Sequence, residues 1–269
     1  MGNTASIKLD DKIAALNALL AKIECTYTAN APAAFASSFG AEDMVLLDVI
    51  ARHANGIKVF TLDTGRLPSE TTDLIHQAQA KYGIAVTSYT PDQAAVKGYV
   101  ERNGMNGFYE SVENRKSCCH IRKVEPLARA LAGKGAWLTG LRREQAPSRA
   151  DLGESEFDAT HQLTKFNPLF DWTNDDVWAY IRANDVPYNA LHGRGYPSIG
   201  CEPCTRAVKP GEDARAGRWW WESKADQKEC GLHVAETAES ARSAEFSAIV
   251  KYQKYPSTPT KMVSVEAKV

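Results

Sequence analysis

Short apolar segments with the composition of buried strands alternate with longer segments of helical periodicity through much of the chain. The stretch APAAFASSFGAEDMVLLDVIARH predicts a strand through about Ser37, a turn at Gly40 and a helix over Ala41–His53. IKVFTLDT and IAVTSYT predict two further strands, separated by a helix with Ser69 as its N-cap and Gly83 at its end. Alternation of this kind produces right-handed βαβ units. We therefore expect an α/β fold with a doubly wound, mainly parallel sheet flanked by helices.

Other patterns indicate how the chain is divided. Residues 11–24 place apolar side chains at helical spacing, which predicts an amphipathic helix before the main fold. VEPLARALAGKG, AWLTG and TNDDVWAYIRAND predict a helix, a buried strand and a helix with Thr173 as its N-cap. After about residue 190 the chain becomes rich in Gly, Pro and aromatic residues. We expect an α/β domain over 1–190, a cysteine-bearing C-terminal segment over 191–233 and a mobile tail over 234–269.

Three loops that follow predicted strands carry polar or basic residues. They read SSFGAED, LDTGRLPSE and LRREQAPSRADL, the last with Arg142, Arg143 and Arg149. Ligands of open α/β sheets bind beside the carboxyl ends of the strands, where these loops lie. The sequence therefore predicts a ligand site at this edge of the sheet.

Charge and hydropathy exclude several functions. The chain has 32 Lys plus Arg and 33 Asp plus Glu, so no global field would concentrate a polyanion such as nucleic acid. No window reaches the ~18 consecutive apolar residues of a membrane span, and the first residues, MGNTASIKLDDK, show no leader pattern. We expect a cytoplasmic protein that binds neither nucleic acid nor a membrane, in which any anion site is local.

Four of the six cysteines form two close pairs. Cys118 and Cys119 are adjacent in ENRKSCCHIRKVEPL, which we expect to be a basic loop, and Cys201 and Cys204 form the C-x-x-C of CEPC. A cytosolic chain of this length needs no disulfide framework, so metal binding or catalysis is the default. Adjacent thiolates reach one zinc ion with difficulty but can bind different irons of a 4Fe–4S cube, which favours the cluster and leaves zinc as the alternative.

The remaining motifs have both a functional and a structural interpretation. Cys230, in KECGLH, lies between Lys228 and His233, which would favour its thiolate and suit a nucleophile, although a lone cysteine near a tail is often incidental. Cys25 ends the first helix and is interpreted as structural. The three tryptophans of RWWWE favour packing between a lid and the body over stacking on a base.

Over about residues 33–233, the chain resembles the assimilatory adenylylsulfate (APS) reductases of the iron–sulfur type. The resemblance is carried by LDTGRLPSET, ENRKSCCHIRKVEPLARAL, TGLRREQ, YNALHGRGYPSIGCEPCT, ARAGRWWWE and KECGLH, together with SSFGAEDMVLL, which is similar to the modified phosphate-binding loop of PP-loop families. It implies an adenine nucleotide alpha hydrolase-like fold, with nucleotide binding over 1–190. The segment over 191–233 would then hold cluster ligands and the catalytic cysteine.

The resemblance also implies a reaction and its residues. APS would be reduced to sulfite and AMP in assimilatory sulfate reduction, through a thiosulfonate on Cys230 that thioredoxin or glutaredoxin releases as sulfite. The protein would tend to form homo-oligomers. A 4Fe–4S cluster would be held by Cys118, Cys119, Cys201 and Cys204. Substrate would be bound by Ser37, Ser38, Gly40, Thr64, Gly65, Arg66, Lys123, Arg142, Arg215, Arg218 and His233.

Three alternatives remain open at this stage. PAPS reductases share the nucleotide loops and the ECGLH end, but lack the four cluster cysteines. PP-loop iron–sulfur enzymes that thiolate tRNA or modify DNA need an ATP-adenylating loop such as S-G-G-x-D-S, whereas this chain has SSFGAED, and a basic surface. A metal-stabilised nucleotide-binding module without enzymatic activity would not need Cys230.

Overall fold

The computed structural model describes residues 8–222, which belong to one compact unit. Cys230, His233 and the tail expected over 234–269 lie outside the described residues, and the domain boundaries at 190 and 233 stay predictions. Across residues 8–222, no helix is both long enough and apolar enough to cross a membrane.

A six-stranded sheet forms the centre of the described residues, with the strand order β3-β2-β1-β4-β6-β5. Neighbouring strands are parallel from β3 to β6, and β5 pairs antiparallel to β6 at one edge. The order runs outward from β1 in both directions, which confirms the doubly wound, mainly parallel sheet. The strands are β1 (Ala33–Ala36), β2 (Lys58–Leu62), β3 (Val86–Tyr89), β4 (Ala136–Leu138), β5 (Ser155–Asp158) and β6 (Leu163–Phe166).

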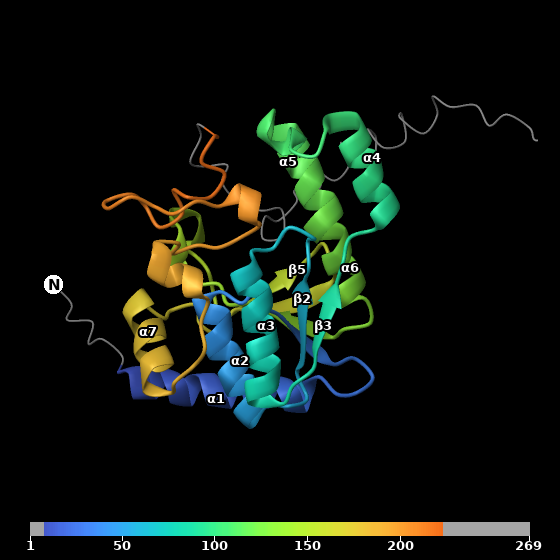
Figure 1. Ribbon diagram of the computed structural model, residues 1–269. Coiled ribbons are helices and arrows are strands. Elements are labelled where there is room, and N and C mark those ends of the chain that lie inside the picture. Colours follow the sequence, from blue (N-terminus) through green and yellow to red (C-terminus); the bar gives the residue numbers. More distant parts are fainter. Residues whose placement is uncertain (1–7, 223–269) are drawn as a thin grey trace, which may run out of the picture. The chain divides into compact units, whose positions relative to one another are not determined.

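Helices cover both faces of the sheet (Figure 1). They are α1 (Leu9–Thr26), α2 (Ala41–His53), α3 (Ser69–Tyr82), α4 (Gln93–Asn103), α5 (Val112–Cys119), α6 (Glu125–Leu131) and α7 (Asn174–Ala183). Successive strand residues point to opposite faces, so Phe35 and Leu138 pack in the larger core with α1, α2, α3 and α7. Trp137 precedes Leu138 in β4, so it points to the other face, where it packs against Leu127 and Leu131 of α6.

Most predicted elements are present, with some corrections. Helix α2 has the predicted bounds, and Thr173 caps α7 by accepting a hydrogen bond from the backbone N–H of Asp176. Ser69 is not an N-cap: α3 begins at Ser69 itself, and the Ser69 hydroxyl bonds Glu70. Cys25 lies within α1 and is exposed, so it does not have the structural role expected for it.

The cysteine pair does not lie in a loop. Cys118 and Cys119 end helix α5, and one turn of π-helix over His120–Val124 continues the chain into α6. Ser111 caps α5 by accepting from the backbone N–H of Asn114. The cap and the continued helical turns therefore fix the direction in which both thiols leave the backbone.

A buried carboxylate joins α2 to α7. Asp48 is fully buried, and it accepts hydrogen bonds from the Tyr180 hydroxyl at 2.8 Å and from Arg52 at 3.0 Å. A buried charge without hydrogen-bond partners is costly, so both contacts stabilise the carboxylate, and the one from Tyr180 also stabilises the packing of the two helices.

We expect Tyr180→Phe to lower the free energy of unfolding by about 2 kcal/mol, because it removes one donor from a buried carboxylate. Urea unfolding measures the change. Tyr188→Phe is the matched control, since Tyr188 is 48% exposed, and it should change stability by less than about 0.5 kcal/mol. Equal effects of the two variants would contradict a stabilising role for the Tyr180 hydroxyl.

Candidate functional site

A cavity of about 770 Å³ lies at the carboxyl edge of the sheet, as the loop positions predict. Its walls come from the loops after β1, β2 and β4, from the turn between α5 and α6, and from the segment after α7. The predicted site residues among its lining are Ser37, Ser38, Gly40, Thr64, Lys123, Arg142, Arg215 and Arg218.

The loop between β1 and α2 is braced by the first turn of α2. Asp43 accepts hydrogen bonds from the backbone N–H of Ser38 at 2.6 Å and from its hydroxyl at 2.7 Å. Gly140, from the loop after β4, packs against this pair: a Cβ added there would lie 2.2 Å from Asp43 Oδ1. The two loops therefore approach each other so closely that only glycine fits at position 140.

The Asp43 carboxyl has an unusual pKa. Burial raises its pKa to about 6, against the opposing hydrogen bonds from Ser38, and the neighbouring charge of Glu42 raises it further. Ser38 was expected to bind nucleotide, but its N–H and hydroxyl are both directed at Asp43. Ser38 thus shapes this wall of the cavity.

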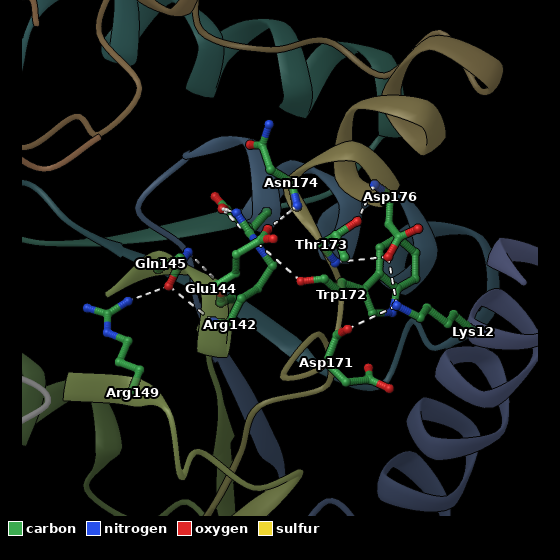
Figure 2. A network of polar contacts seen from close by, with 12 residues as sticks. Lys12, Arg142, Glu144, Gln145, Arg149, Asp171, Trp172, Thr173, Asn174 and Asp176 are labelled. Atoms are coloured by element: carbon green, nitrogen blue, oxygen red, sulfur yellow. Dashed lines mark hydrogen bonds and ion pairs between the residues drawn. The ribbon is translucent and has the colours of Figure 1, made fainter. Parts of the chain in front are cut away.

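Arg142 is the centre of a buried polar network beside the cavity. Its Nε and Nη2 donate to Glu42 Oε1 at 3.0 and 2.7 Å. Its Nη1 donates to Glu144 at 3.1 Å and to the Trp172 carbonyl at 3.2 Å (Figure 2). Arg142 was expected to contact substrate, yet two carboxylates already offset its charge. The observed contacts make it a brace between the loop after β4, α2 and the segment before α7.

The same network continues along the loop and into α7 (Figure 2). Gln145 donates to the Gly140 carbonyl at 3.3 Å, and its Oε1 accepts from Arg149, which lines the cavity. Glu144 accepts from the backbone N–H of Asn174, the first residue of α7, at 2.5 Å. The start of α7 is in turn held to α1 through Lys12 and Asp176, 2.7 Å apart.

The four predicted ligand cysteines converge on a second, small cavity of about 20 Å³. Cys118 and Cys119 reach it from the end of α5, and Cys201 and Cys204 flank a single 3-10 turn, η6 (Glu202–Cys204). The structure thus brings together two pairs that are far apart in sequence. Within residues 8–222, however, no three His, Cys, Asp or Glu side chains are placed to bind one metal ion together.

Basic and hydroxyl groups surround these thiols. Arg66, Arg115, Arg122 and Lys123 line the small cavity, and Lys123 also lines the large one. Thr64 Oγ1 lies 3.3 Å from Cys201 Sγ, and Arg122 donates to the Thr64 carbonyl at 2.6 Å. The two cavities therefore share a wall at Lys123, and Thr64 of the large cavity contacts a cysteine of the small one.

Burial controls the protonation of the buried thiols. It raises the pKa of Cys204 to about 12, with a further upward contribution from Cys201, and outweighs the opposing effects of Lys123 and Arg218. The pKa of Cys118 is raised for the same first reason. Thiolates at these positions would need additional positive charge among them, which a bound metal centre supplies.

Trp219 connects the cysteine cavity with the large cavity. The guanidinium groups of Arg115 and Arg218 lie 4.7 and 4.9 Å from the centroid of its ring, and its backbone N–H donates to the Cys204 carbonyl at 3.2 Å. Arg115 is buried and pairs with Glu222 at 2.7 Å. Trp219 has a positive φ of 42°, a strained value for a bulky residue. Trp219 thus packs as RWWWE predicts, although it also lines the large cavity.

Other predicted residues lie elsewhere. Gly65 and Arg66 are outside the lining of the large cavity, and Arg66 instead binds the Met105 carbonyl and Asn106 and lines the cysteine cavity. Cys230 and His233 lie outside the described residues. The lining residues that sequence reasoning overlooked include Glu42, Asp43, Gln145 and His192. Glu42 and Asp43 stand within the loop motif SSFGAED and could have been singled out there, whereas nothing local distinguishes His192.

The Asp43 pKa predicts a pH-dependent stability. In the unfolded chain this carboxyl ionises near its ordinary pKa of 3.8, but in the folded protein its pKa is about 6. The unfolded state therefore loses its proton first, and the contribution of Asp43 to stability falls as pH rises through this window, by up to about 3 kcal/mol.

Urea unfolding of the wild type and of Asp43→Asn between about pH 4 and pH 7 tests this. The stability of the wild type relative to the variant should decrease as pH rises and then become constant. A difference that increases with pH would show that the Asp43 pKa is lowered on folding.

Comparison with known proteins shows the family of this chain. A family model described as phosphoadenosine phosphosulfate reductase domain matches residues 32–207. The adenosine 5'-phosphosulfate reductase of Burkholderia cepacia is 55% identical over 241 residues, which cover 90% of this chain and 95% of that protein. The protein of the same name from Allochromatium vinosum is 56% identical over 210 residues, covering 78% of this chain and 82% of that protein.

A solved structure agrees with these relatives. The phosphoadenylyl-sulfate (PAPS) reductase from Candida auris, in a phosphate complex, superposes with a TM-score of 0.59 and 26% identity, covering 77% of this chain and all of that one. The likeness confirms the adenine nucleotide alpha hydrolase-like fold predicted from the sequence. The chain therefore belongs to the phosphoadenosine phosphosulfate reductase domain family, among its adenosine 5'-phosphosulfate reductases.

Proposed function

We propose that this protein reduces APS to sulfite and AMP in assimilatory sulfate reduction. One observation carries the proposal: a cavity lined by several cations shares the wall containing Lys123 with a pocket of four cysteines. The names of the relatives support the same substrate, since proteins 55% and 56% identical to this chain are adenosine 5'-phosphosulfate reductases.

The anionic end of APS would lie near the shared wall. Its phosphate and sulfate oxygens accept hydrogen bonds and repel an incoming thiolate, so cations must offset their charge. Lys123, Arg215 and Arg218 line the cavity and suit this task. The hydrogen bonds of Arg218 to the Ser198 hydroxyl at 3.2 Å and the Ile199 carbonyl at 3.3 Å go to neutral acceptors, so its positive charge can act on the ligand.

The covalent step is assigned to Cys230. Its thiolate would attack the sulfur of APS, forming an S–S bond while the bond from that sulfur to the bridging phosphate oxygen breaks and AMP leaves. A dithiol of thioredoxin or glutaredoxin would then supply two electrons: one thiol attacks Cys230 Sγ, sulfite departs, and the second thiol resolves the mixed disulfide. AMP is a stable leaving group, so the reaction needs no strong general acid.

The chemistry of the cysteine cavity fits a 4Fe–4S cluster better than zinc. Four thiols line one cavity, and adjacent cysteines suit the separate corners of a cluster better than a single ion. Cys118, Cys119, Cys201 and Cys204 would hold it. When bound, the cluster together with its four thiolates would carry a net negative charge beside Lys123. That charge would tune the electrostatic potential of the substrate cavity.

The second candidate function is the reduction of PAPS. It is favoured by the superposition on a PAPS reductase, at 26% identity. APS is preferred as substrate because the adenosine 5'-phosphosulfate reductases are about twice as similar in sequence and because the four cysteines share a cavity. The cytoplasmic location and the homo-oligomer expected from the sequence stay predictions.

Sulfite release from APS and from PAPS, in the presence of reduced thioredoxin, tests the proposed reaction. We expect faster turnover of APS by anaerobically purified protein, and a loss of at least about a thousandfold in Cys230→Ser, because no other group forms the thiosulfonate. Cys25→Ser is the control and should keep full activity, since Cys25 is an exposed residue of α1. Equal or faster turnover of PAPS would favour the second candidate function, and unchanged activity of Cys230→Ser would exclude the thiosulfonate route.

Iron and acid-labile sulfide, quantified on the same samples, test the cofactor. The wild type and Cys25→Ser should each contain about four irons per chain, and Cys204→Ser should lose most of them because one corner of the cluster lacks its ligand. Zinc in place of iron, or an unchanged iron content in Cys204→Ser, would contradict the assignment.

A further inference from the structure

The imidazole of His192 forms part of the wall of the large cavity. It lies on a 3-10 turn, η5 (Ala190–Arg194), whose start is held by Asn189. Asn189 accepts from the backbone N–H of Leu191 at 3.0 Å and donates to Thr71 on α3 at 2.9 Å. The position of the ring is therefore fixed by the body of the fold.

The tautomer of His192 follows from one contact. Its Nδ1 lies 2.9 Å from the carbonyl oxygen of Tyr196, which can only accept, so Nδ1 carries the hydrogen. Burial lowers the pKa of His192, more than Glu42 and the Tyr196 carbonyl raise it, so the ring is neutral at pH 7. Nε2 therefore presents a lone pair.

No donor for this lone pair is found among residues 8–222. Nε2 is buried and has no hydrogen-bond partner within the described residues. The ring cannot easily turn away, because Trp178, which also lines the cavity, packs edge-on against it at a centroid distance of 5.4 Å and an angle of 86°. A buried acceptor left unpaired is unfavourable, and such groups in native proteins usually bind a ligand or water.

The chemistry of APS restricts which part of it could serve this acceptor. Its phosphate and sulfate carry only acceptor oxygens at neutral pH, whereas its donors are the two ribose hydroxyls and the adenine amine. Glu42, whose charge acts on His192, would further disfavour an anionic group here. The anionic end suits the wall where Lys123 lies beside the cysteines.

We propose that His192 is a nucleoside-binding residue whose Nε2 accepts a hydrogen bond from a neutral donor, a ribose hydroxyl or the adenine amine. This inference rests on the proposed function, since it takes an adenine nucleotide as the ligand. In a ligand that carries a phosphate in the place of that donor, acceptor oxygens would face the Nε2 lone pair. The contact therefore also contributes to selectivity against such a ligand.

Calorimetric titration tests this on the full chain with its metal centre, using AMP, 2'-deoxy-AMP, 3'-deoxy-AMP and purine riboside 5'-monophosphate. Each of the last three lacks one donor. The wild type should bind one of them about tenfold more weakly than AMP, and that ligand identifies the donor.

Two variants complete a thermodynamic cycle. His192→Leu should bind AMP about tenfold more weakly than the wild type but should bind the identified analogue with unchanged affinity, because that analogue has no donor to lose. His192→Gln, which can place an amide oxygen near the position of Nε2, should recover part of the affinity for AMP. A purely structural role would instead weaken AMP and all three analogues by the same factor.

The outcomes separate this inference from the function on which it rests. Wild-type protein that binds AMP and all three analogues equally would overturn the role of His192 without any variant. His192→Leu with wild-type affinity for AMP would overturn it as well. A wild type that fails to bind AMP would overturn the inference, whereas the proposed function itself would be overturned by a failure to release sulfite from APS.

Discussion

The pairing of buried charges at the carboxyl edge of the sheet is the constraint on which the site depends. Asp43, Arg115, Arg122, Arg142 and Arg218 are all buried there, and a buried charge without partners costs several kcal/mol. Each has at least one contact with a segment outside its own helix or strand. Breaking any of these contacts would leave a buried charge without a partner. The loops are therefore held in one arrangement, and the cavity between them is largely preformed.

The same constraint links the two cavities. Arg115 and Arg218 both contact the Trp219 ring. Arg115 lines the cysteine cavity, Arg218 lines the large cavity, and Lys123 lines both. The backbone N–H of Trp219 donates a hydrogen bond to the Cys204 carbonyl. A change of charge or geometry at the cysteines therefore reaches the cations of the large cavity through direct contacts. This provides a physical basis for an electrostatic role of a metal centre that takes no part in electron transfer.

The sequence was sufficient for features that depend on local patterns or on edge geometry. Helix α2 was predicted to the residue because Gly40 and the apolar spacing mark it, and the four cysteines were grouped correctly because their residue type is rare. Helix α5 was mistaken for a loop, since VENRKSCC has no apolar stripe and is defined by the Ser111 cap. The hairpin of β5 and β6 was not predicted because both strands are short and β5 is mostly exposed.

Site residues were harder to predict because their partners are distant in sequence. Arg142 was placed correctly near the cavity, but its role as a brace depends on Glu42, which lies 100 residues earlier in the chain. Arg66 faces the cysteines because Met105 and Asn106 hold it there, another contact that no local pattern shows. A sequence motif thus identifies which loops meet, whereas the partner of each charge decides whether it binds a ligand or supports the wall.

The distribution of these partners gives the large cavity two groups of lining residues with unlike charge. Around Glu42, Arg142 and Glu144 the charges are offset within the protein, and the neighbouring His192 presents a neutral acceptor. Around Lys123 and Arg218 the cations adjoin thiols that burial keeps protonated, or a metal centre. A ligand with neutral donors at one end and several negative charges at the other matches both groups in only one orientation. Since a reversed ligand would set its anionic oxygens against Glu42 and the His192 lone pair, the cavity itself can direct the reactive end of a sulfonucleotide toward the wall shared with the cysteines.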